Sequence, residues 1–274
     1  MSSSVQSSIF PIAFALLGTI SSAQFAFADD GGISFGGSPH LLSGHPSVSM
    51  QSEVVRMDIH DELIKVDCHF VFHNSSNAPA TVRVGFPDEG LGAEEPYQGE
   101  PLPPLSKLKA TFLTYDSYVN GKKVPTKLVP TKDRGLFWHT KTVTFAPNKD
   151  CLIRDVYTLR PGGQVTSENG TYKQTSYVLH TGSSWKGPIG SAEIIVTFAP
   201  DALKTPVTLK PVTDFKNDPA TLEWSKLPKN TMLWSGPCKP TLSGSTLTFK
   251  TSKLKPTVKD DIKLFYSFHK NTNM

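Results

Sequence analysis

The chain has 274 residues and a formal net charge of +4, with 38% hydrophobic residues, 20 glycines and 22 prolines. This glycine and proline content is well below that of a disordered or collagen-like chain, and the composition also excludes a polytopic membrane protein. The length is sufficient for a sizeable core, in one large domain or two smaller ones.

The first 28 residues carry no charged side chain and include an apolar run from Ile9 to Ile20. That run is too short to cross a bilayer, which takes roughly 20 apolar residues. The small residues of Ala26-Phe27-Ala28 follow it, directly before Asp29. We therefore predict a secretory signal peptide, cleaved between Ala28 and Asp29, and export to the periplasm or the extracellular space. An uncleaved membrane anchor is the alternative, and no later segment predicts a transmembrane span.

Alternation of apolar and polar residues with period 2 dominates the rest of the chain, whereas helical periodicity is nearly absent. The clearest run is 63–73, whose predicted inward residues are Ile64, Val66, Cys68, Phe70 and Phe72. Asn120-Gly121, within 119–124, indicates a tight hairpin. Further β-rich runs are separated by Gly, Pro, Asn and Asp at the spacing of a sandwich. The sequence therefore predicts an all-β fold built from antiparallel β-sandwiches.

The predicted organisation is a signal peptide over 1–28, a main β-sandwich domain over 29–200 and a C-terminal β region over 201–274. Composition changes after Pro200 to a Lys-, Pro- and Thr-rich sequence. This last region is either a second small β unit or the closing strands of the first.

Charge is unevenly divided, with 12 acidic and 3 basic residues in 29–100 against 12 acidic and 25 basic residues in 101–274. The lysines are scattered singly, so we interpret them as solvated strand faces and protected edges. Two halves that attract each other, or a basic surface for an anionic partner, are alternatives. No nucleic-acid partner is expected, because an exported chain without a known binding motif gives no reason for one.

Three cysteines, Cys68, Cys151 and Cys238, give an odd number in an oxidising compartment. Cys68 lies on the inward face of a predicted strand, which favours a buried free thiol. Cys151 and Cys238 both lie near predicted loops. They are therefore the candidate disulfide pair.

The most distinctive segment is 181–190, between two predicted strands. It contains three glycines, among them Gly182 and Gly187, together with Pro188 and Trp185. Such a loop suits a sharp reversal that swings Trp185 back over the end of the sheets as a plug. The alternative is an exposed Trp185 on a rigid turn that stacks on a ligand.

Four tryptophans are candidates for a sugar-stacking platform, although large aromatics in β domains are more often core residues. They are Trp138, Trp185, Trp224 and Trp234. Searches for nucleophile, zinc-protease and phosphate-loop motifs find none. The sequence therefore predicts no catalytic, metal-binding or cofactor-binding residue and no cofactor.

Five segments, in order, resemble an uncharacterised secreted bacterial family, the domain of unknown function 4424. They are Gly31–Phe35, Met50–Val55, Phe70–Asn74, Val84–Pro87 and Tyr177–Ile189. The N-terminal part also resembles the all-β domain of inter-alpha-trypsin inhibitor heavy chains. The first resemblance implies export and a β fold, and that family supplies no catalytic residue.

These observations predict an exported, non-enzymatic β-rich protein that acts by contact with a protein or a cell-envelope polymer. The first alternative is a carbohydrate-binding module that uses exposed tryptophan. A weaker alternative is a divergent hydrolase whose site is assembled from distant loops.

Overall fold

The computed structural model describes residues 30–31, 35–43, 47–89, 104, 109–131, 136–166, 170–204, 207–214, 222–228 and 230–267. The predicted cleavage site between Ala28 and Asp29 lies outside these residues. No helix in the described part of the chain has the length and apolar character needed to cross a membrane.

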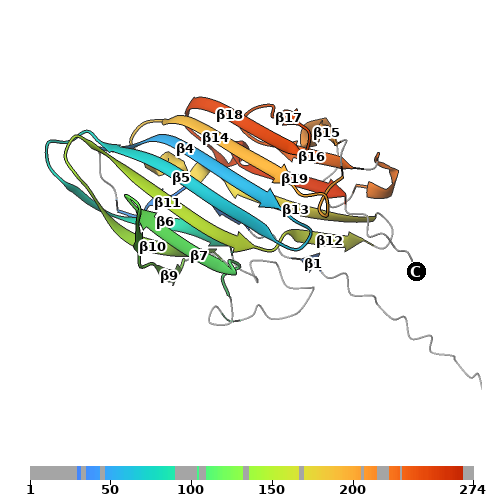
Figure 1. Cartoon of the computed structure of the whole chain (residues 1–274), viewed down its shortest axis with the longest axis horizontal. Coiled ribbons are helices and arrows are strands. Elements are labelled where there is room, and N and C mark those ends of the chain that lie inside the picture. The colour runs from blue at the N-terminus through green and yellow to red at the C-terminus, as the bar shows by residue number, and fades with distance from the viewer. Residues whose placement is uncertain are drawn as a thin grey trace, which may run out of the picture.

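The fold is all-β and consists of two facing layers (Figure 1). The first layer is an eight-stranded sheet. Its strands, in spatial order, are β17 (Thr241–Ser243), β18 (Thr246–Leu254), β14 (Ile189–Phe198), β4 (Val48–Ile59), β5 (Ile64–Asn74), β11 (Lys149–Leu159), β7 (Thr114–Val119) and β8 (Lys122–Val124).

The second layer combines a seven-stranded and a four-stranded sheet. The seven-stranded sheet holds β1 (Asp30–Gly31), β12 (Gly162–Thr166), β13 (Gly170–Val178), β19 (Ile262–Ser267), β16 (Thr231–Ser235) and β15 (Thr208–Pro211), with β2 (Phe35–Gly37) also paired to β13. The four-stranded sheet holds β3 (His40–Leu41), β6 (Ala80–Glu89), β10 (Leu136–Phe145) and β9 (Lys127–Pro130). Because β2 pairs with β13 and β3 pairs with β6, the segment 35–41 joins the two sheets.

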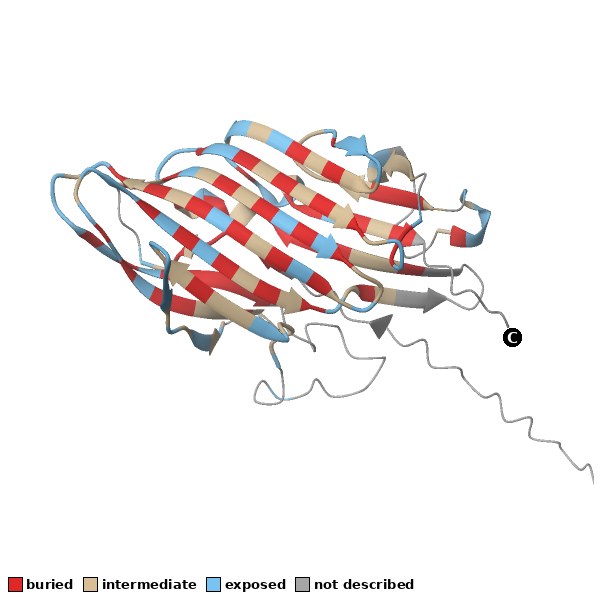
Figure 2. Cartoon of the chain, in the orientation of Figure 1, coloured by how far each residue is buried: buried red, intermediate tan, exposed pale blue. Residues whose placement is uncertain are grey.

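The core lies between the layers and follows the alternation along the strands (Figure 2). All five predicted inward residues of β5 are at most 1% exposed, while His69 on the opposite face is exposed. Aromatic rings meet across the interface, with centroids 5.8 Å apart for Phe72 and Phe145 and 5.2 Å apart for Phe198 and Tyr266. The prediction of a half-buried strand here is confirmed.

The Asn-Gly hairpin is also confirmed. It joins β7 to β8 through Asn120 at φ 50° and Gly121 at φ 78°. Two successive positive φ values are the geometry of a type I′ turn, which matches the twist of the flanking strands.

Not every strand pair is antiparallel. The pairs β14–β4, β13–β2 and β15–β16 run parallel. Parallel neighbours require a crossover, and the chain between β4 and β14 passes repeatedly through the other layer before it returns. The sandwich is therefore mixed where the sequence predicted an antiparallel one.

Strands from 201–274 pair directly with earlier strands. β18 pairs with β14 in the first layer, and β19 pairs with β13 in the second. The short 3₁₀ segments η3 (Val212–Asp214) and η5 (Trp224–Lys226) lie on the outer face of the second layer, where Trp224 stacks on Tyr172 at 5.1 Å. This region therefore adds strands to both layers and covers part of one of them.

The predicted disulfide between Cys151 and Cys238 is wrong, because all three cysteines are free. Cys151 lies on β11, whereas the Cys238 thiol contacts the Lys250 carbonyl oxygen of β18 at 3.5 Å. Three strands separate β11 from β18 in the sheet, which places them roughly 19 Å apart. A disulfide needs Cα atoms no more than about 7 Å apart. The prediction that Cys68 is buried and free is confirmed.

Candidate functional site

The segment 181–190 starts in the 3₁₀ turn η2 (His180–Ser184) and ends in β14. Trp185 is only 4% exposed, and its indole Nε1 donates a hydrogen bond to the Pro39 carbonyl oxygen at 2.7 Å. Its ring centroid lies 4.3 Å from that of Phe72, inside the core. The plug interpretation of Trp185 is therefore confirmed, and its alternative as an exposed stacking residue is wrong.

The other residues that the sequence analysis singled out in this segment lie partly in the core and partly at the surface. Gly182 is buried, and a Cβ there would meet the Ile189 side chain at 3.0 Å and that of Ser38 at 3.2 Å. Gly187 has a φ of +70° in open space, and Pro188 beside it is exposed. The glycines thus have two functions, since one permits close packing and the other permits a left-handed turn.

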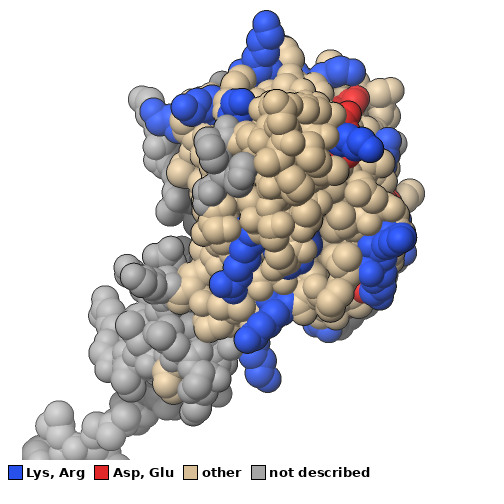
Figure 3. Space-filling view, turned by 90° about the vertical axis from the view of Figure 1, so that its left-hand side faces the viewer, with Lys and Arg blue, Asp and Glu red and all other residues tan. Residues whose placement is uncertain are grey.

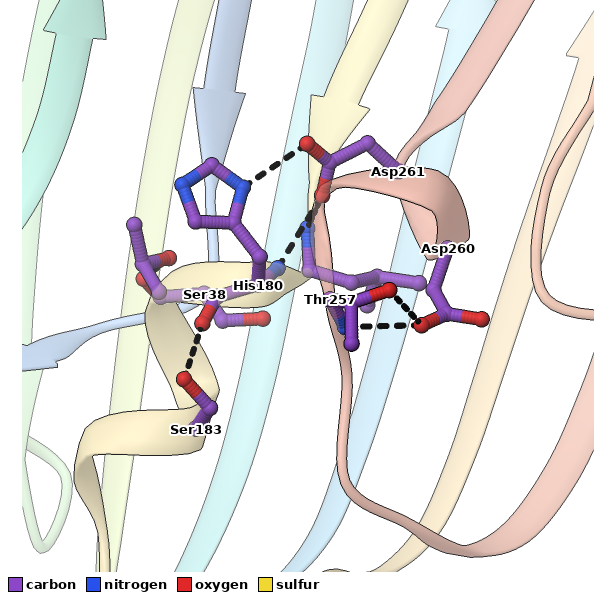
Figure 4. Close-up of polar contacts among 8 residues, drawn as sticks. Ser38, His180, Ser183, Thr257, Asp260 and Asp261 are labelled. Carbon is purple, nitrogen blue, oxygen red and sulfur yellow. Dashed lines mark hydrogen bonds and ion pairs between the residues drawn. The ribbon is translucent and has the colours of Figure 1, made fainter.

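A histidine–carboxylate pair lies at the start of the same segment. The Nδ1 of His180 and the Oδ2 of Asp261 are 2.7 Å apart (Figure 4). The Oδ1 of Asp261 accepts two further bonds, from the backbone N–H groups of Leu179 at 2.8 Å and His180 at 3.0 Å. The carboxylate is 7% exposed, but the imidazole is 39% exposed. Asp261 therefore fixes the ring from the inside, and the rest of the imidazole faces solvent.

The turn that carries Asp261 is itself held by a capping box. Asp260, the last residue of η6 (Val258–Asp260), accepts bonds from the Thr257 backbone N–H at 2.7 Å and from its hydroxyl at 2.8 Å (Figure 4). On the other side, the Ser183 hydroxyl donates to the His180 carbonyl oxygen at 2.7 Å. Ser183 thus stabilises the turn and is not directed at the imidazole.

A second histidine lies beside this pair. His40 of β3 donates from Nδ1 to the Thr181 carbonyl oxygen at 3.3 Å. Burial lowers the pKa of His40; the bond to Thr181 raises it and the nearby charge of His180 lowers it. His40 is therefore neutral near pH 7, so its Nε2 is a hydrogen-bond acceptor.

The His40 ring stacks on Trp138 of β10, with centroids 5.3 Å apart and planes at 21°. Gly85 of β6 makes room for this stack, because a Cβ there would meet the Trp138 ring at 3.0 Å. Three contacts thus link Trp138, His40, His180 and Asp261: the His40–Trp138 stack, the His40–Thr181 hydrogen bond and the His180–Asp261 pair. We call these four residues the His–Trp face. Such a surface offers a partly exposed aromatic plane and ring nitrogens that exchange hydrogen bonds with a polar ligand.

Among the residues that the structure describes, no three His, Cys, Asp or Glu side chains are placed to hold a metal ion. No nucleophilic side chain in the described ranges is hydrogen-bonded to the outer nitrogen of His180.

The other three tryptophans do not join Trp138. Trp224 is 2% exposed, and Trp234 packs against the main core with its ring centroid 6.0 Å from that of Phe249. With Trp185 in the core as well, the favoured interpretation of the tryptophans as core residues holds for Trp185 and Trp224, while Trp234 is partly buried against the core.

A group of buried ionisable side chains lies between the layers, and sequence reasoning missed it. Glu53 of β4 is fully buried, with the Ser38 hydroxyl and the Tyr177 hydroxyl both donating to its Oε1 at 2.7 Å. Burial raises the pKa of Glu53 to about 7, against the two hydrogen bonds, which lower it. Its Oε2 has no partner among the described residues.

Two ion pairs extend this buried group. The Lys141 ammonium contacts both carboxylate oxygens of Asp155, at 2.6 and 2.8 Å, with both side chains at most 1% exposed. His139 contacts Asp88 at 2.9 Å, and Asp88 also accepts a bond from the Thr111 backbone N–H. The alternation could have revealed these residues, since Glu53, Lys141 and Asp155 each occupy an inward position of a strand.

Comparisons with known proteins support the fold only. No family model matches the chain, and no curated protein matches it. A "putative nutrient binding protein" from Legionella pneumophila has a similar structure, with a TM-score of 0.62 and 19% identity over 86% of this chain and 72% of that one.

Two further solved structures are more distant. One is an M1 zinc metallopeptidase from Deinococcus radiodurans, with a TM-score of 0.36 and 10% identity over 82% of this chain and 43% of that one. The other is the yeast LTA4 hydrolase, with a TM-score of 0.40 and 7% identity over 83% of this chain and 30% of that one. The chain spans less than half of either enzyme, and TM-scores this low do not establish a shared fold.

Proposed function

We propose that the protein is an exported, non-enzymatic binding protein of the periplasm or the extracellular space, and that it contacts its partner through the His–Trp face. The observation that carries this proposal is the fixed imidazole of His180. Asp261 holds it by Nδ1, which leaves Nε2 free to face a partner, and the stacked His40 bonds the carbonyl oxygen of the next residue, Thr181. Preorganised side chains of this kind lose little entropy when they bind a ligand.

The placement of the Ser183 hydroxyl supports binding over catalysis. A serine nucleophile is activated by a hydrogen bond to the imidazole, with a carboxylate orienting the ring from its other nitrogen. Here the carboxylate and the ring are present, but Ser183 donates to a backbone carbonyl oxygen. The similarity to the Legionella protein, whose description is "putative nutrient binding protein", is compatible with a binding role. The resemblance to the domain of unknown function 4424 belongs to the same proposal and adds no activity.

Carbohydrate remains the second candidate ligand, and one observation favours it. Trp138 is partly exposed and lies beside polar ring nitrogens, which is the combination that stacks on a sugar and hydrogen-bonds its hydroxyls. The alternative thus rests on a single tryptophan, and no longer on four.

The test is isothermal titration of the purified protein with peptidoglycan fragments, lipopolysaccharide and neutral glycans. We expect one class to bind, and Trp138→Ala and His180→Ala each to weaken that binding at least tenfold. The matched control is Tyr118→Ala, which removes a partly exposed aromatic from β7 in the other layer. Binding that is equally strong in all three variants would move the site away from the His–Trp face.

The non-enzymatic part is tested separately with esterase, peptidase and glycosidase substrate panels. Turnover that disappears in His180→Ala or Asp261→Asn would replace the binding proposal with the hydrolase alternative. Turnover that survives both substitutions and further purification would place a catalytic site elsewhere in the protein, whereas turnover lost on further purification comes from a contaminating enzyme.

A further inference from the structure

One end of the sandwich carries a set of exposed lysines that the His–Trp face does not include. Strand pairing defines this end, because Lys149 of β11 pairs with Asn74 of β5 and Leu254 of β18 pairs with Ile189 of β14. Five exposed lysines lie at or beside these strand ends: Lys149, Lys186, Lys253, Lys255 and Lys259. We call this surface the basic end, and Figure 3 shows more basic than acidic side chains in this view.

The acidic side chains at this end already have partners. Asp150 contacts His73 at 2.7 Å, and Asp260 is held in the capping box with Thr257. At the opposite end, the turn between β4 and β5 carries Asp61 and Glu62. This end therefore presents five exposed lysines while its acidic side chains Asp150 and Asp260 are already paired, which is what the third alternative left open by the sequence, a basic surface for an anionic partner, requires.

An apolar side chain is exposed at the basic end, on the η6 turn that follows β18. Val258 is 65% exposed, more than the other large hydrophobic residues noted as exposed in the described chain, and it lies between Lys255 and Lys259. The capping box fixes the η6 turn that presents it. A lone exposed valine has no significance by itself. On a fixed turn, next to Lys259 and close in sequence to Lys253 and Lys255, however, it matches a bilayer interface, where lysines contact phosphates and an apolar tip enters the acyl boundary.

We propose that the basic end docks on the surface of a bilayer that contains anionic phospholipid. The lysines supply the electrostatic attraction, and Val258 enters the headgroup region as the apolar contact. Each lysine near an anionic membrane surface strengthens binding by about fivefold. Five such residues are enough for reversible attachment of the protein at low salt. Neither the His–Trp face nor its ligand is needed for this attachment.

Cosedimentation with vesicles of phosphatidylglycerol mixed with phosphatidylcholine tests the proposal. The purified mature protein, which begins at Asp29, should bind these vesicles at low salt, should release them at high salt because the charges are screened, and should not bind pure phosphatidylcholine. Lys255→Glu combined with Lys259→Glu should weaken binding by about 25-fold or more. The matched control is Lys65→Glu combined with Lys204→Glu, which changes the net charge equally at the opposite end and should leave binding within about twofold.

The valine distinguishes a membrane from a soluble polyanion of the same charge. Val258→Ser keeps all charges and should weaken vesicle binding by about fivefold, while any binding of soluble polyphosphate should not change. The proposal would be overturned if neutral vesicles bound as strongly as anionic ones, or if both double variants lost binding to the same extent. Binding of polyphosphate without binding of vesicles would also overturn it. Circular dichroism spectra of the variants show whether each is folded. Loss of ligand binding in Trp138→Ala with intact vesicle binding would affect the proposed function alone.

Discussion

Trp185→Ala is expected to be one of the most destabilising single substitutions in this protein. The indole is 4% exposed, its centroid lies 4.3 Å from that of Phe72 and 6.1 Å from that of Phe145, and Nε1 donates to Pro39. Truncation removes the ring, leaves a cavity at the end of the core and orphans the Pro39 carbonyl oxygen. Large aromatic truncations in cores cost about 3–5 kcal/mol of unfolding free energy. For a domain of this size, that corresponds to a fall in melting temperature of about 10 °C.

Urea denaturation and calorimetry measure this loss directly. Trp185→Phe keeps a six-membered ring in the core but loses the pyrrole part of the indole with its N–H, so a cost of about 1–3 kcal/mol, below that of Trp185→Ala, is expected. Trp138→Ala, on the partly exposed stack, is the control and should cost clearly less than Trp185→Ala. A Trp185→Ala protein that melts at the wild-type temperature would refute the reasoning that the segment 181–190 closes the core.

Three further predictions concern the buried polar groups and the thiols. Burial raises the pKa of Glu53 from 4.5 to about 7. Between those pH values, the folded protein keeps a proton on Glu53 that the unfolded chain has lost. The unfolding free energy therefore falls as pH rises through this range, by up to about 3 kcal/mol. Glu53→Gln should remove this fall in urea titrations at about pH 5 and about pH 8, and an unchanged pH dependence would contradict the assignment. Asp155→Asn should cost about 3–5 kcal/mol because it leaves the Lys141 charge buried without its counter-ion, whereas the double variant Lys141→Met/Asp155→Leu should recover much of that loss. Because burial raises the pKa of the Cys68 thiol, a thiol reagent should not label Cys68 in the native protein. In unfolded, non-reduced protein, the reagent should label all three cysteines, and fewer than three labelled cysteines would indicate a disulfide.

Local patterns in the sequence were sufficient for several elements. The alternation in 63–73 predicted β5 and its buried face, because period-2 spacing is a property of the strand itself. Asn120-Gly121 predicted a hairpin because only residues tolerant of positive φ fit that turn. The burial of Trp185 followed from the composition of its loop. Each of these features depends on neighbours along the chain.

The candidate site depends on contacts that no local pattern encodes. Asp261 and His180 meet only because β19 pairs beside β13, and His40 reaches Trp138 only because β3 pairs with β6. The choice of Cys151 and Cys238 as a disulfide failed for the same reason, since closeness to loops does not determine which strands become neighbours. Buried charged residues such as Lys141 occupy inward positions of the alternation but are not apolar, so a search for hydrophobic patterns does not identify them.

The parallel pairing of β4 with β14 has a consequence for how the protein folds. These two strands come from opposite halves of the chain and lie at the centre of the eight-stranded sheet. Until β14 has emerged and crossed back, one edge of β4 has no partner, and its apolar face, with Met57 and Val55, has only part of its cover. Contacts of such long sequence separation slow folding, and an open strand edge invites pairing with another chain. Productive folding therefore has to wait for the second half of the chain, and a factor that shields β4 in the interval would raise the yield of folded protein.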